Sequence, residues 1–370
     1  MKYYIIAGEA SGDLHGSNLM KALQEKDHNA EFRFWGGNLM QNIGGTLVKH
    51  YKDLAFMGFL EVAKNISTIL KNIKFCKQDI LDYKPDVLIL VDYPGFNLRI
   101  AEFAKKNHIK VIYYISPQLW AWKEGRVEKI KNYVDEMLVI LPFEKDFYKK
   151  HSVKTHFVGH PLLDAISDLQ PIDHQQFKIK NKLNEKEIIA LLPGSREQEV
   201  KKMLDIMLSV RPHFKDYQFV IAGAPSLSKE FYQNFVDEDV HFVSNKTYDL
   251  LRCSKAALVT SGTATLETAL LNIPEIVCYK TSRISYEIGK RVVKNLKYIS
   301  LVNLIMDQEI VTELIQNHLN TKNLVNNLNE ILEGEKRQKM LENFAILRDK
   351  LGGKGASNHA AEIIVDFTKK

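Results

Sequence analysis

The pattern that most constrains this chain is a series of short apolar runs, each followed by an amphipathic stretch, that occurs twice along the sequence. The expected strands are 2–7, 86–91, 110–115, 136–141 and 155–159 in the first half, and 188–192, 218–223, 240–244, 256–260 and 275–280 in the second. Near-continuous apolar strands separated by helices are typical of parallel sheets that are buried on both faces. A polar stretch at 167–187 separates the two sets. The sequence therefore predicts an α/β protein with two Rossmann-like domains.

Length and composition agree with this prediction. A chain of 370 residues with 45% hydrophobic and 26% charged residues is typical of a soluble globular protein with two domains. The net charge of +6 is not gathered into a basic segment, so charge gives no support to nucleic-acid binding. The three cysteines form no CxxC pair, which favours a reducing, cytoplasmic compartment. No apolar run reaches the roughly 18 residues of a spanning helix, and contact with a membrane surface stays open.

Ligands of such sheets bind beyond the carboxyl ends of the strands, so the residues after each expected strand are the candidates. In the second half these are Gly194, Ser195 and Arg196 after one strand, and Ser261, Gly262 and Thr263 after another. Both turns offer small residues at a helix N-terminus, and the first adds a guanidinium. We interpret them as a diphosphate site, with Glu267 accepting the hydroxyls of a ribose. The alternatives are a capping box at Ser195 and Gln198 and a helix-dipole role for Glu267.

The first half carries a carboxylate and aromatic rings at such positions. Asp92 ends an apolar strand, where burial would raise the pKa of its carboxyl and suit it to act as a base; the alternative is a helix cap. Trp120 offers a flat face to a sugar ring, to an acyl chain or to the core. His160 lies at the domain junction, with a structural and a catalytic role both open. No metal site is expected, because the DED string at 237–239 precedes a strand instead of following one.

Residues 56–75 form an amphipathic pattern with a basic side. Leu60, Ile66, Ile69 and Leu70 recur at helical spacing, with lysines elsewhere. Such a helix lies either on an anionic membrane surface or against the sheet, and the residues alone favour the packed helix.

Nine strings occur in an order that resembles one known family. They are AGEASGD (7–13), MGFLEV (57–62), DYPGFN (92–97), SPQLWAW (116–122), LPFE (141–144), VGHPL (158–162), LLPGSREQE (191–199), SGTATLE (261–267) and SLVNLI (300–305). On these strings the chain resembles the lipid-A-disaccharide synthases. The resemblance implies a GT-B glycosyltransferase fold, with two Rossmann-like domains whose parallel sheets face an interdomain cleft. It divides the chain into an acceptor- and membrane-facing domain at 1–168, completed by a C-terminal helix at 352–370, and a UDP-sugar donor domain at 169–351.

The resemblance also implies the reaction. The donor is UDP-2,3-diacylglucosamine, the acceptor is 2,3-diacylglucosamine 1-phosphate (lipid X), and the products are UDP and the β-1,6-linked lipid A disaccharide 1-phosphate, with inversion at the anomeric carbon. No cofactor, metal or nucleic acid is implied. The enzyme would be peripheral on the cytoplasmic face of the inner membrane, and an oligomer stays open.

Residue by residue, the resemblance assigns roles to matching positions. Asp92 matches the family's candidate base, Glu267 its ribose-binding residue, and Asn303 a position near the donor. With lipid substrates, the membrane-facing patch becomes Leu60, Val62, Ile66, Ile69 and Leu70. Four residues depart from the pattern of many family members: Gln118, Leu119, Tyr93 and Gly95. The last two lie beside Asp92. The acyl-chain and acceptor preferences therefore stay open.

The first glycine-rich turn, IIAGEASGDLHGS (5–17), resembles a phosphate loop, but its carboxylates would repel phosphate. We therefore expect Glu9, Ser11 and Asp13 to face Asp92 across the cleft, where they contact sugar hydroxyls or orient the base. The alternative for Asp13 is a cap of the helix that follows it. The remaining residues expected on the acceptor side are Gln118, Trp120 and His160.

Two rival interpretations keep the same fold. One is another UDP-sugar enzyme, such as a UDP-N-acetylglucosamine 2-epimerase, which needs neither the apolar stripe nor the DYPGFN string. The other is a UDP-sugar sensor without catalysis, in which Asp92 would be dispensable.

Overall fold

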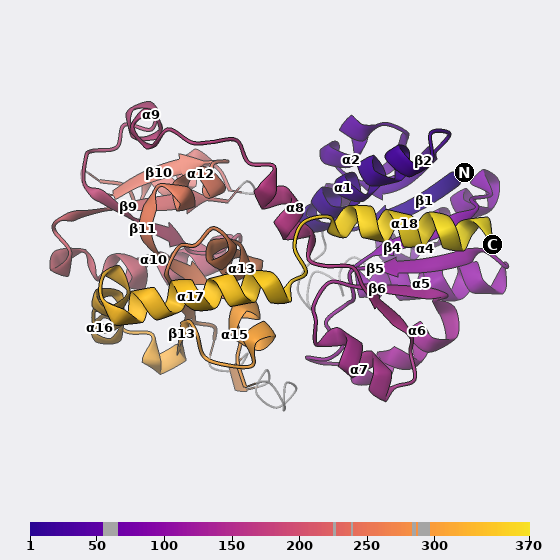
Figure 1. Ribbon diagram of the computed structural model, residues 1–370. Coiled ribbons are helices and arrows are strands. Elements are labelled where there is room, and N and C mark those ends of the chain that lie inside the picture. Colours follow the sequence, from indigo (N-terminus) through magenta and orange to yellow (C-terminus); the bar gives the residue numbers. More distant parts are fainter. Residues whose placement is uncertain (55–65, 225–226, 238–239, 283–285, 288–296) are drawn as a thin grey trace. The chain divides into compact units, whose positions relative to one another are not determined.

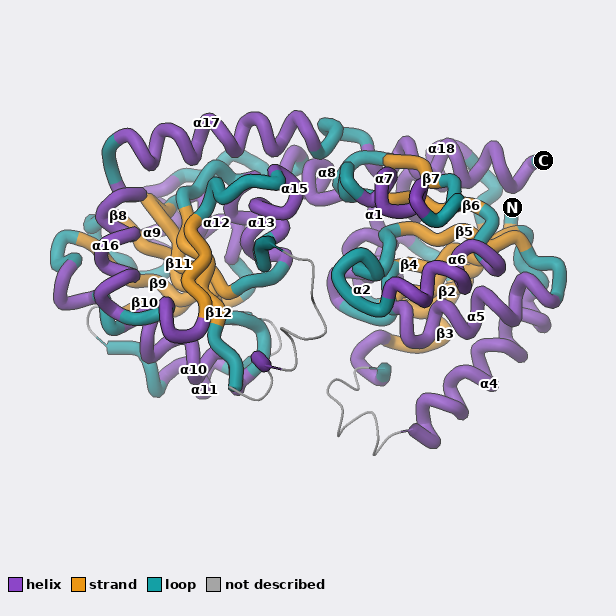
Figure 2. Tube along the Cα trace, turned by 90° about the horizontal axis from the view of Figure 1, so that it is seen from below, coloured by secondary structure: helices purple, strands orange, loops and turns teal. Residues whose placement is uncertain are grey.

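The computed structural model describes residues 1–54, 66–224, 227–237, 240–282, 286–287 and 297–370. The chain forms two compact units, the first of Met1–Asp164 with Leu351–Lys370 and the second of Ala165–Lys350. Each unit holds one parallel sheet with helices on both faces, as Figures 1 and 2 show. The predicted α/β class with two Rossmann-like domains is confirmed. The helix α8 (Pro161–Ser167) carries the chain from the first unit into the second.

The first unit is built on a sheet in the order β3-β2-β1-β4-β5-β6-β7. Its strands are β1 (Lys2–Ala7), β2 (Glu31–Gly36), β3 (Thr46–His50), β4 (Val87–Val91), β5 (Lys110–Tyr114), β6 (Glu136–Val139) and β7 (Thr155–Phe157). Its helices are α1 (Ala10–Lys26), α2 (Asn38–Ile43), α4 (Ile66–Tyr83), α5 (Pro94–Lys106), α6 (Val127–Tyr133), α7 (Glu144–Lys150) and α18 (Ala356–Lys369). The C-terminal α18 returns to this unit and packs beside α1 (Figure 1).

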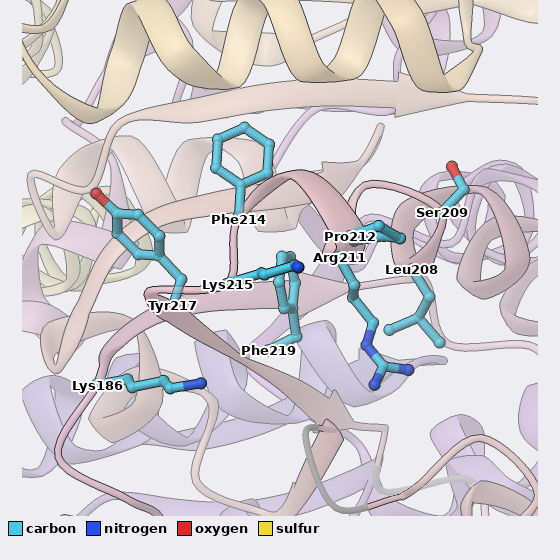
Figure 3. Close-up of a pocket in the computed structure, with 9 residues that line it drawn as sticks. All are labelled: Lys186, Leu208, Ser209, Arg211, Pro212, Phe214, Lys215, Tyr217 and Phe219. Carbon is cyan, nitrogen blue, oxygen red and sulfur yellow. The ribbon is translucent and has the colours of Figure 1, made fainter.

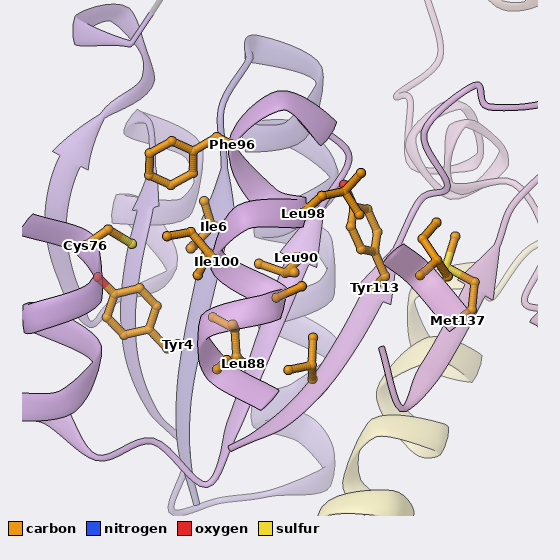
Figure 4. Packing of buried hydrophobic residues seen from close by; sticks show 14 of the residues in the cluster. Tyr4, Ile6, Cys76, Leu88, Leu90, Phe96, Leu98, Ile100, Tyr113 and Met137 are labelled. Carbon is orange, nitrogen blue, oxygen red and sulfur yellow. The ribbon is translucent and has the colours of Figure 1, made fainter. Parts of the chain in front are cut away.

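The core of the first unit explains why its strands are apolar at nearly every position. All five residues of β4 are buried, because helices cover both faces of the sheet. The cluster in Figure 4 includes Leu88 and Leu90 of β4, Cys76 of α4 and Ile100 of α5. Full burial of one aliphatic side chain contributes about 1.5–3 kcal/mol. This packing fixes the strand ends at which the candidate side chains lie.

The second unit is built on a sheet in the order β10-β9-β8-β11-β12-β13. Its strands are β8 (Glu187–Leu192), β9 (Tyr217–Gly223), β10 (Val240–Ser244), β11 (Ser254–Thr260), β12 (Glu275–Tyr279) and β13 (Thr312–Ile315). Its helices are α9 (His174–Lys180), α10 (Glu197–Leu208), α11 (Lys229–Gln233), α12 (Thr247–Arg252), α13 (Thr263–Leu270), α15 (Leu301–Met306), α16 (Thr321–Leu332) and α17 (Glu335–Lys350).

All the strands expected from the apolar runs are present, but β2, β3 and β13 were not predicted. The strands β3 and β13 are the edges of their sheets, and most of their side chains are only half buried. In β2, β3 and β13 the apolar run is interrupted by a charged residue, which is Arg33, Lys49 and Glu313 respectively.

The order of the strands defines one reversal point in each sheet. The chain adds β2 and β3 on one side of β1 and then places β4 on the other side; β8, β9, β10 and β11 repeat this arrangement. In open parallel sheets, ligands bind beyond the carboxyl ends of the strands at such a point. The relevant loops are therefore those after β1 and β4, and those after β8 and β11. Within the described part of the chain, no helix is both long and apolar enough to cross a bilayer.

Candidate active site

Asp92 lies at the reversal point of the first sheet, directly after β4 and beside the end of β1. Asp92 (φ 43°) and Tyr93 (φ 49°) both adopt the left-handed backbone region, which residues other than glycine rarely enter. The Asp92 carbonyl oxygen is held by the Asn97 side-chain amide at 2.7 Å and by the Tyr113 hydroxyl at 2.5 Å. A strained conformation that surrounding bonds maintain is a frequent property of functional sites.

The glycine-rich turn after β1 makes room for this strained segment. A Cβ atom on Gly8 would lie 2.4 Å from the Tyr93 ring, which stacks on Phe96 with centroids 5.6 Å apart. Gly8 is therefore needed for close packing between the two strand ends. This explains a glycine in a turn that carries carboxylates and does not suit phosphate.

The Asp92 carboxyl has the acid–base property that the sequence predicts. Burial raises its pKa to about 7, and the negative charge of Glu9 adds to this effect, against a backbone hydrogen bond from Tyr93. Glu9 is half-buried immediately before α1. A carboxyl with this pKa is partly ionised at neutral pH and suits general base catalysis.

Asp13 has a different role from the one expected. Only 3% of the residue is exposed, and its carboxylate accepts the backbone N–H groups of Gly37 at 2.8 Å, Leu39 at 3.1 Å and Met40 at 3.1 Å. These donors belong to the start of α2, so Asp13 holds the N-terminus of a distant helix. The expectation that Asp13 contacts a substrate is corrected, as is the alternative that it caps α1.

His160 is also corrected to a structural role. His160 is 4% exposed, and its backbone N–H donates to the Leu351 carbonyl at 3.0 Å. Its ring Nδ1 accepts from the backbone N–H of Leu162 at 3.2 Å. Burial and the neighbouring His15 lower the pKa of His160 to about 3, so the ring is neutral. Among the other residues expected on the acceptor side, Ser11 and Gln118 are exposed and Trp120 is half-buried.

Glu144, which sequence reasoning missed, lies beneath the loop that follows β5. Its buried carboxyl accepts Leu141 N–H at 3.0 Å. Burial raises the pKa of Glu144 to about 8, although Ser116 and the Trp120 indole favour its charged form. Glu144 therefore joins the loops after β5 and β6, and its place in the LPFE string was the available signal.

The first turn of the donor side follows β8. Gly194 has a φ of 114°, and the N-cap of α10 is Arg196, which makes no side-chain capping bond. Ser195 precedes this N-cap and is exposed. The exposed Arg196 guanidinium lies 3.4 Å from Glu199 Oε1.

The second turn of the donor side follows β11. Ser261 N–H donates to the Cys278 carbonyl at 3.2 Å, and its hydroxyl donates to the Ile299 carbonyl at 3.0 Å. Gly262 is the N-cap of α13, and no atom lies within 4 Å of where its Cβ would stand; Thr263 is exposed. The Ser261 hydroxyl thus fixes the turn, and the first N–H groups of α13 are the donors at this strand end that are suited to an anion.

Glu267 lies one turn into α13. Burial raises its pKa to about 7, while a hydrogen bond with Tyr248 of α12 favours its charged form. An acceptor carboxylate at this position suits a pair of hydroxyl donors.

The polar atoms of the Asn303 side chain all bond within the protein. Asn303 is fully buried, its amide N–H groups donate to the Val311 carbonyl and to Glu313 Oε1, and its Oδ1 accepts from Ile310 and Val311 N–H. Glu313 also accepts from Ile299 N–H at 2.9 Å and from Ser300 N–H at 3.0 Å. The expected donor contact is corrected: Asn303 and Glu313 support the segment that holds Ser261.

The expected membrane-facing patch is divided. Ile66 and Leu70 on α4 are 58% and 54% exposed, and Phe75 adds a further ring at 50%. Ile69 packs against the core, which corrects its assignment to the patch. Leu60 and Val62 lie outside the described residues.

A cavity of about 500 Å³ in the second unit is separate from these residues. Figure 3 shows its lining, which includes Lys186, Arg211, Lys215, Phe214 and Tyr217. Lys186 precedes β8 and Tyr217 begins β9, so the cavity lies at the amino edge of the sheet. Ligands of parallel sheets bind at the opposite edge, so we do not assign the donor to it.

Comparison with known proteins agrees with this geometry. The family model described as lipid-A-disaccharide synthetase (LpxB) matches residues 3–365. The lipid-A-disaccharide synthase of Syntrophus aciditrophicus (strain SB) is 39% identical over 377 residues, which cover 99% of this chain and 97% of that protein. The structure of UDP-GlcNAc 2-epimerase from Neisseria meningitidis bound to UDP-GlcNAc has a TM-score of 0.70 at 14% identity, over 99% of this chain and 100% of that one. The glycotransferase of kitacinnamycin has a TM-score of 0.67 at 11% identity, over 99% of this chain and 98% of that one.

The two parallel-sheet units, with Asp92 and the turns after β8 and β11 at the strand ends, define a protein of the GT-B fold. The solved structures show the fold alone, which an epimerase shares. The chain belongs to the lipid-A-disaccharide synthase family, as the nine strings predicted.

Proposed function

We propose that this protein transfers 2,3-diacylglucosamine from UDP to the 6-hydroxyl of 2,3-diacylglucosamine 1-phosphate, with inversion at the anomeric carbon. The products are UDP and the β-1,6-linked lipid A disaccharide 1-phosphate. The observation that carries the proposal is Asp92: in a chain of this family, it is a carboxyl of pKa about 7 on a strained turn at the carboxyl edge of its sheet.

In this mechanism the Asp92 carboxylate accepts the proton of the acceptor 6-hydroxyl. The oxygen forms its bond to the anomeric carbon of the donor as the bond from that carbon to the UDP oxygen breaks. Arg196 and the first N–H groups of α13 stabilise the charge that grows on the diphosphate. Glu267 accepts the ribose hydroxyls. Glu9 keeps the proton affinity of Asp92 high through its negative charge.

Peripheral contact with the cytoplasmic face of the inner membrane is part of the proposal, because both substrates carry acyl chains. The exposed side chains of Ile66, Leu70 and Phe75 on α4, with Lys71 and Lys74 also exposed, support it. An apolar surface bordered by lysines is suited to an anionic bilayer. We expect Ile66→Ser with Leu70→Ser to reduce sedimentation with phosphatidylglycerol vesicles and to leave unfolding stability unchanged; undiminished sedimentation would exclude this face.

The test of the reaction is to incubate the purified protein with both diacylated sugars and to identify the products by mass spectrometry. The expected result is one disaccharide 1-phosphate for each UDP released. UDP-N-acetylglucosamine without acyl chains is the control, because an epimerase would convert it to its 2-epimer. Epimer formation, or no disaccharide from the acylated pair, would contradict the proposal.

A further inference from the structure

Two cationic side chains, Lys123 and Arg126, lie on one tight turn after the loop that follows β5. Lys123 adopts the left-handed region (φ 59°), and its carbonyl accepts Arg126 N–H at 2.9 Å. The residues between them begin a short 3₁₀ turn, Glu124–Arg126. Lys123 is the N-cap of this turn, and the charge of Arg126 acts on the Lys123 ammonium, so the two positive groups lie near each other.

Neither cation has a described carboxylate as its ion-pair partner. No ion pair with a described residue involves Lys123 or Arg126, and the carboxylate within their turn, Glu124, bonds to His151 at 3.0 Å instead. Burial and the charge of Arg126 lower the pKa of Lys123. Two cations that repel each other create a local positive potential, which a doubly charged anion would neutralise.

The turn lies at the same edge of the sheet as Asp92. Its loop follows β5, the neighbour of β4, and the charge of Arg126 acts on Tyr113. The Tyr113 hydroxyl in turn donates to the Asp92 carbonyl at 2.5 Å. The Lys123 ammonium also lies 4.1 Å from the centre of the Trp122 ring, which is 43% exposed. An apolar ring from the loop that follows β5 therefore borders the cations.

We propose that Lys123 and Arg126 bind the phosphate monoester of the acceptor sugar. The inference rests on the proposed function, because it assigns the part of the acceptor that these residues recognise. A phosphate monoester carries between one and two negative charges at neutral pH, and a guanidinium binds two of its oxygens at once. This contact selects the phosphorylated acceptor and orients its 6-hydroxyl toward Asp92.

The test compares two acceptors, 2,3-diacylglucosamine with and without the 1-phosphate, in neutral detergent micelles. We expect Lys123→Gln and Arg126→Gln each to lower kcat/KM for the phosphorylated acceptor at least about tenfold, the usual loss for a hydrogen bond between charged groups. The KM for the donor should stay unchanged. On the acceptor without phosphate, each variant should match the wild type within about twofold. Lys129→Gln, an exposed change on α6 that removes only a 3.7 Å contact with Glu102, is the matched control and should have no effect.

Other results would overturn the assignment in distinct ways. Equal losses on both acceptors would show that the cations do not read the phosphate. A raised KM for the donor would show that the two cations bind the donor diphosphate instead. Normal kinetics in micelles with weaker binding to phosphatidylglycerol vesicles would give them to lipid headgroups.

A binding measurement separates this inference from the reaction itself. Glucosamine 1-phosphate should change the tryptophan fluorescence of the wild type, glucosamine alone should not, and the double variant Lys123→Gln with Arg126→Gln should lose the response. If the wild type binds the sugar phosphate in this way but forms no disaccharide, the proposed reaction fails and the cation site stands. If the double variant binds as the wild type does, the cation site fails.

Discussion

Substitution of Asp13 separates a structural from a catalytic role for the first glycine-rich turn. Its carboxylate, 3% exposed, accepts three N–H groups at 2.8, 3.1 and 3.1 Å from the start of α2. A hydrogen bond to a charged acceptor is worth about 1.5–3 kcal/mol, but bonds to one carboxylate are not additive. Removal of the Asp13 carboxylate leaves these backbone N–H groups without an acceptor, and each buried donor left unsatisfied costs about 1–3 kcal/mol. We therefore expect Asp13→Ala to lower the free energy of unfolding of the first unit by about 4 kcal/mol.

Asp13→Asn should have about half this effect. The amide keeps one oxygen, which can accept from Gly37 and Met40, but its NH₂ group then faces the N–H of Leu39. We expect a loss of about 2 kcal/mol. The folded variant should retain its kcat at low temperature, because Asp13 does not touch the substrate.

The assay is urea unfolding followed by tryptophan fluorescence. All three tryptophans, Trp35, Trp120 and Trp122, belong to the first unit, so the signal reports on that unit. Asp92→Asn is the control, since it should abolish turnover without a comparable loss of stability. An Asp13→Asn protein that unfolds as the wild type does and has lost its turnover would refute the structural role.

Three further predictions concern the side chains of Glu313, Glu275 and His15. Glu313→Gln removes the charged acceptor of the Ile299 and Ser300 N–H groups, so it should raise the KM for the donor about tenfold and leave kcat within about threefold. Steady-state kinetics measures both constants, and an unchanged KM for the donor would contradict the prediction. Glu275→Met should stabilise the second unit by about 1–3 kcal/mol, because both carboxyl oxygens of Glu275 are buried without a described partner. Burial raises the pKa of Glu275, so the wild type loses stability as pH rises above the unfolded pKa of about 4.3. Unfolding followed by circular dichroism should therefore show that Glu275→Met gains more stability over the wild type at pH 8 than at pH 5. An equal gain at the two pH values would count against an ionisable cause. Burial lowers the pKa of His15 to about 4, so the neutral ring stabilises the fold above the unfolded pKa of about 6.5, and this stabilisation is lost as pH falls. Between pH 7 and pH 5 the free energy of unfolding of the wild type should therefore fall by about 2 kcal/mol more than that of His15→Leu in urea unfolding. Parallel losses in the two proteins would contradict a neutral ring.

The sequence predicted the central strands well because their signal is local. Strands covered on both faces must be apolar at consecutive positions, and this pattern marks β1, β4, β8 and β11. The reversal points follow from these strands, so Asp92, Arg196 and Glu267 could be found by their positions after strand ends. The strands β2, β3 and β13 each contain a charged residue that interrupts the run, and they were missed.

Residues whose partners are distant in the sequence could not be interpreted from the sequence. From the sequence alone, Asp13 resembles a carboxylate that faces a substrate. Its partners are the N–H groups of Gly37 and Met40, which are far from it in the sequence. Asn303 lies in a string that matches the family, yet its amide serves the backbone at 310–311. Glu144 acquires its raised pKa from burial, which no local pattern reveals. The family strings therefore mark segments near the site without separating residues that bind from residues that support.

The central claim is that the Asp92 carboxylate is the base, and the pH dependence of kcat/KM for the acceptor tests it most directly. The base must be ionised, so the rate should fall about tenfold per pH unit below about 7 and level off above it. Asp92→Asn should lose about a thousandfold in rate, within the range of general base catalysis, and bind UDP as the wild type does. A flat profile between pH 5.5 and 7, or an Asp92→Asn enzyme within tenfold of the wild type, would contradict the account.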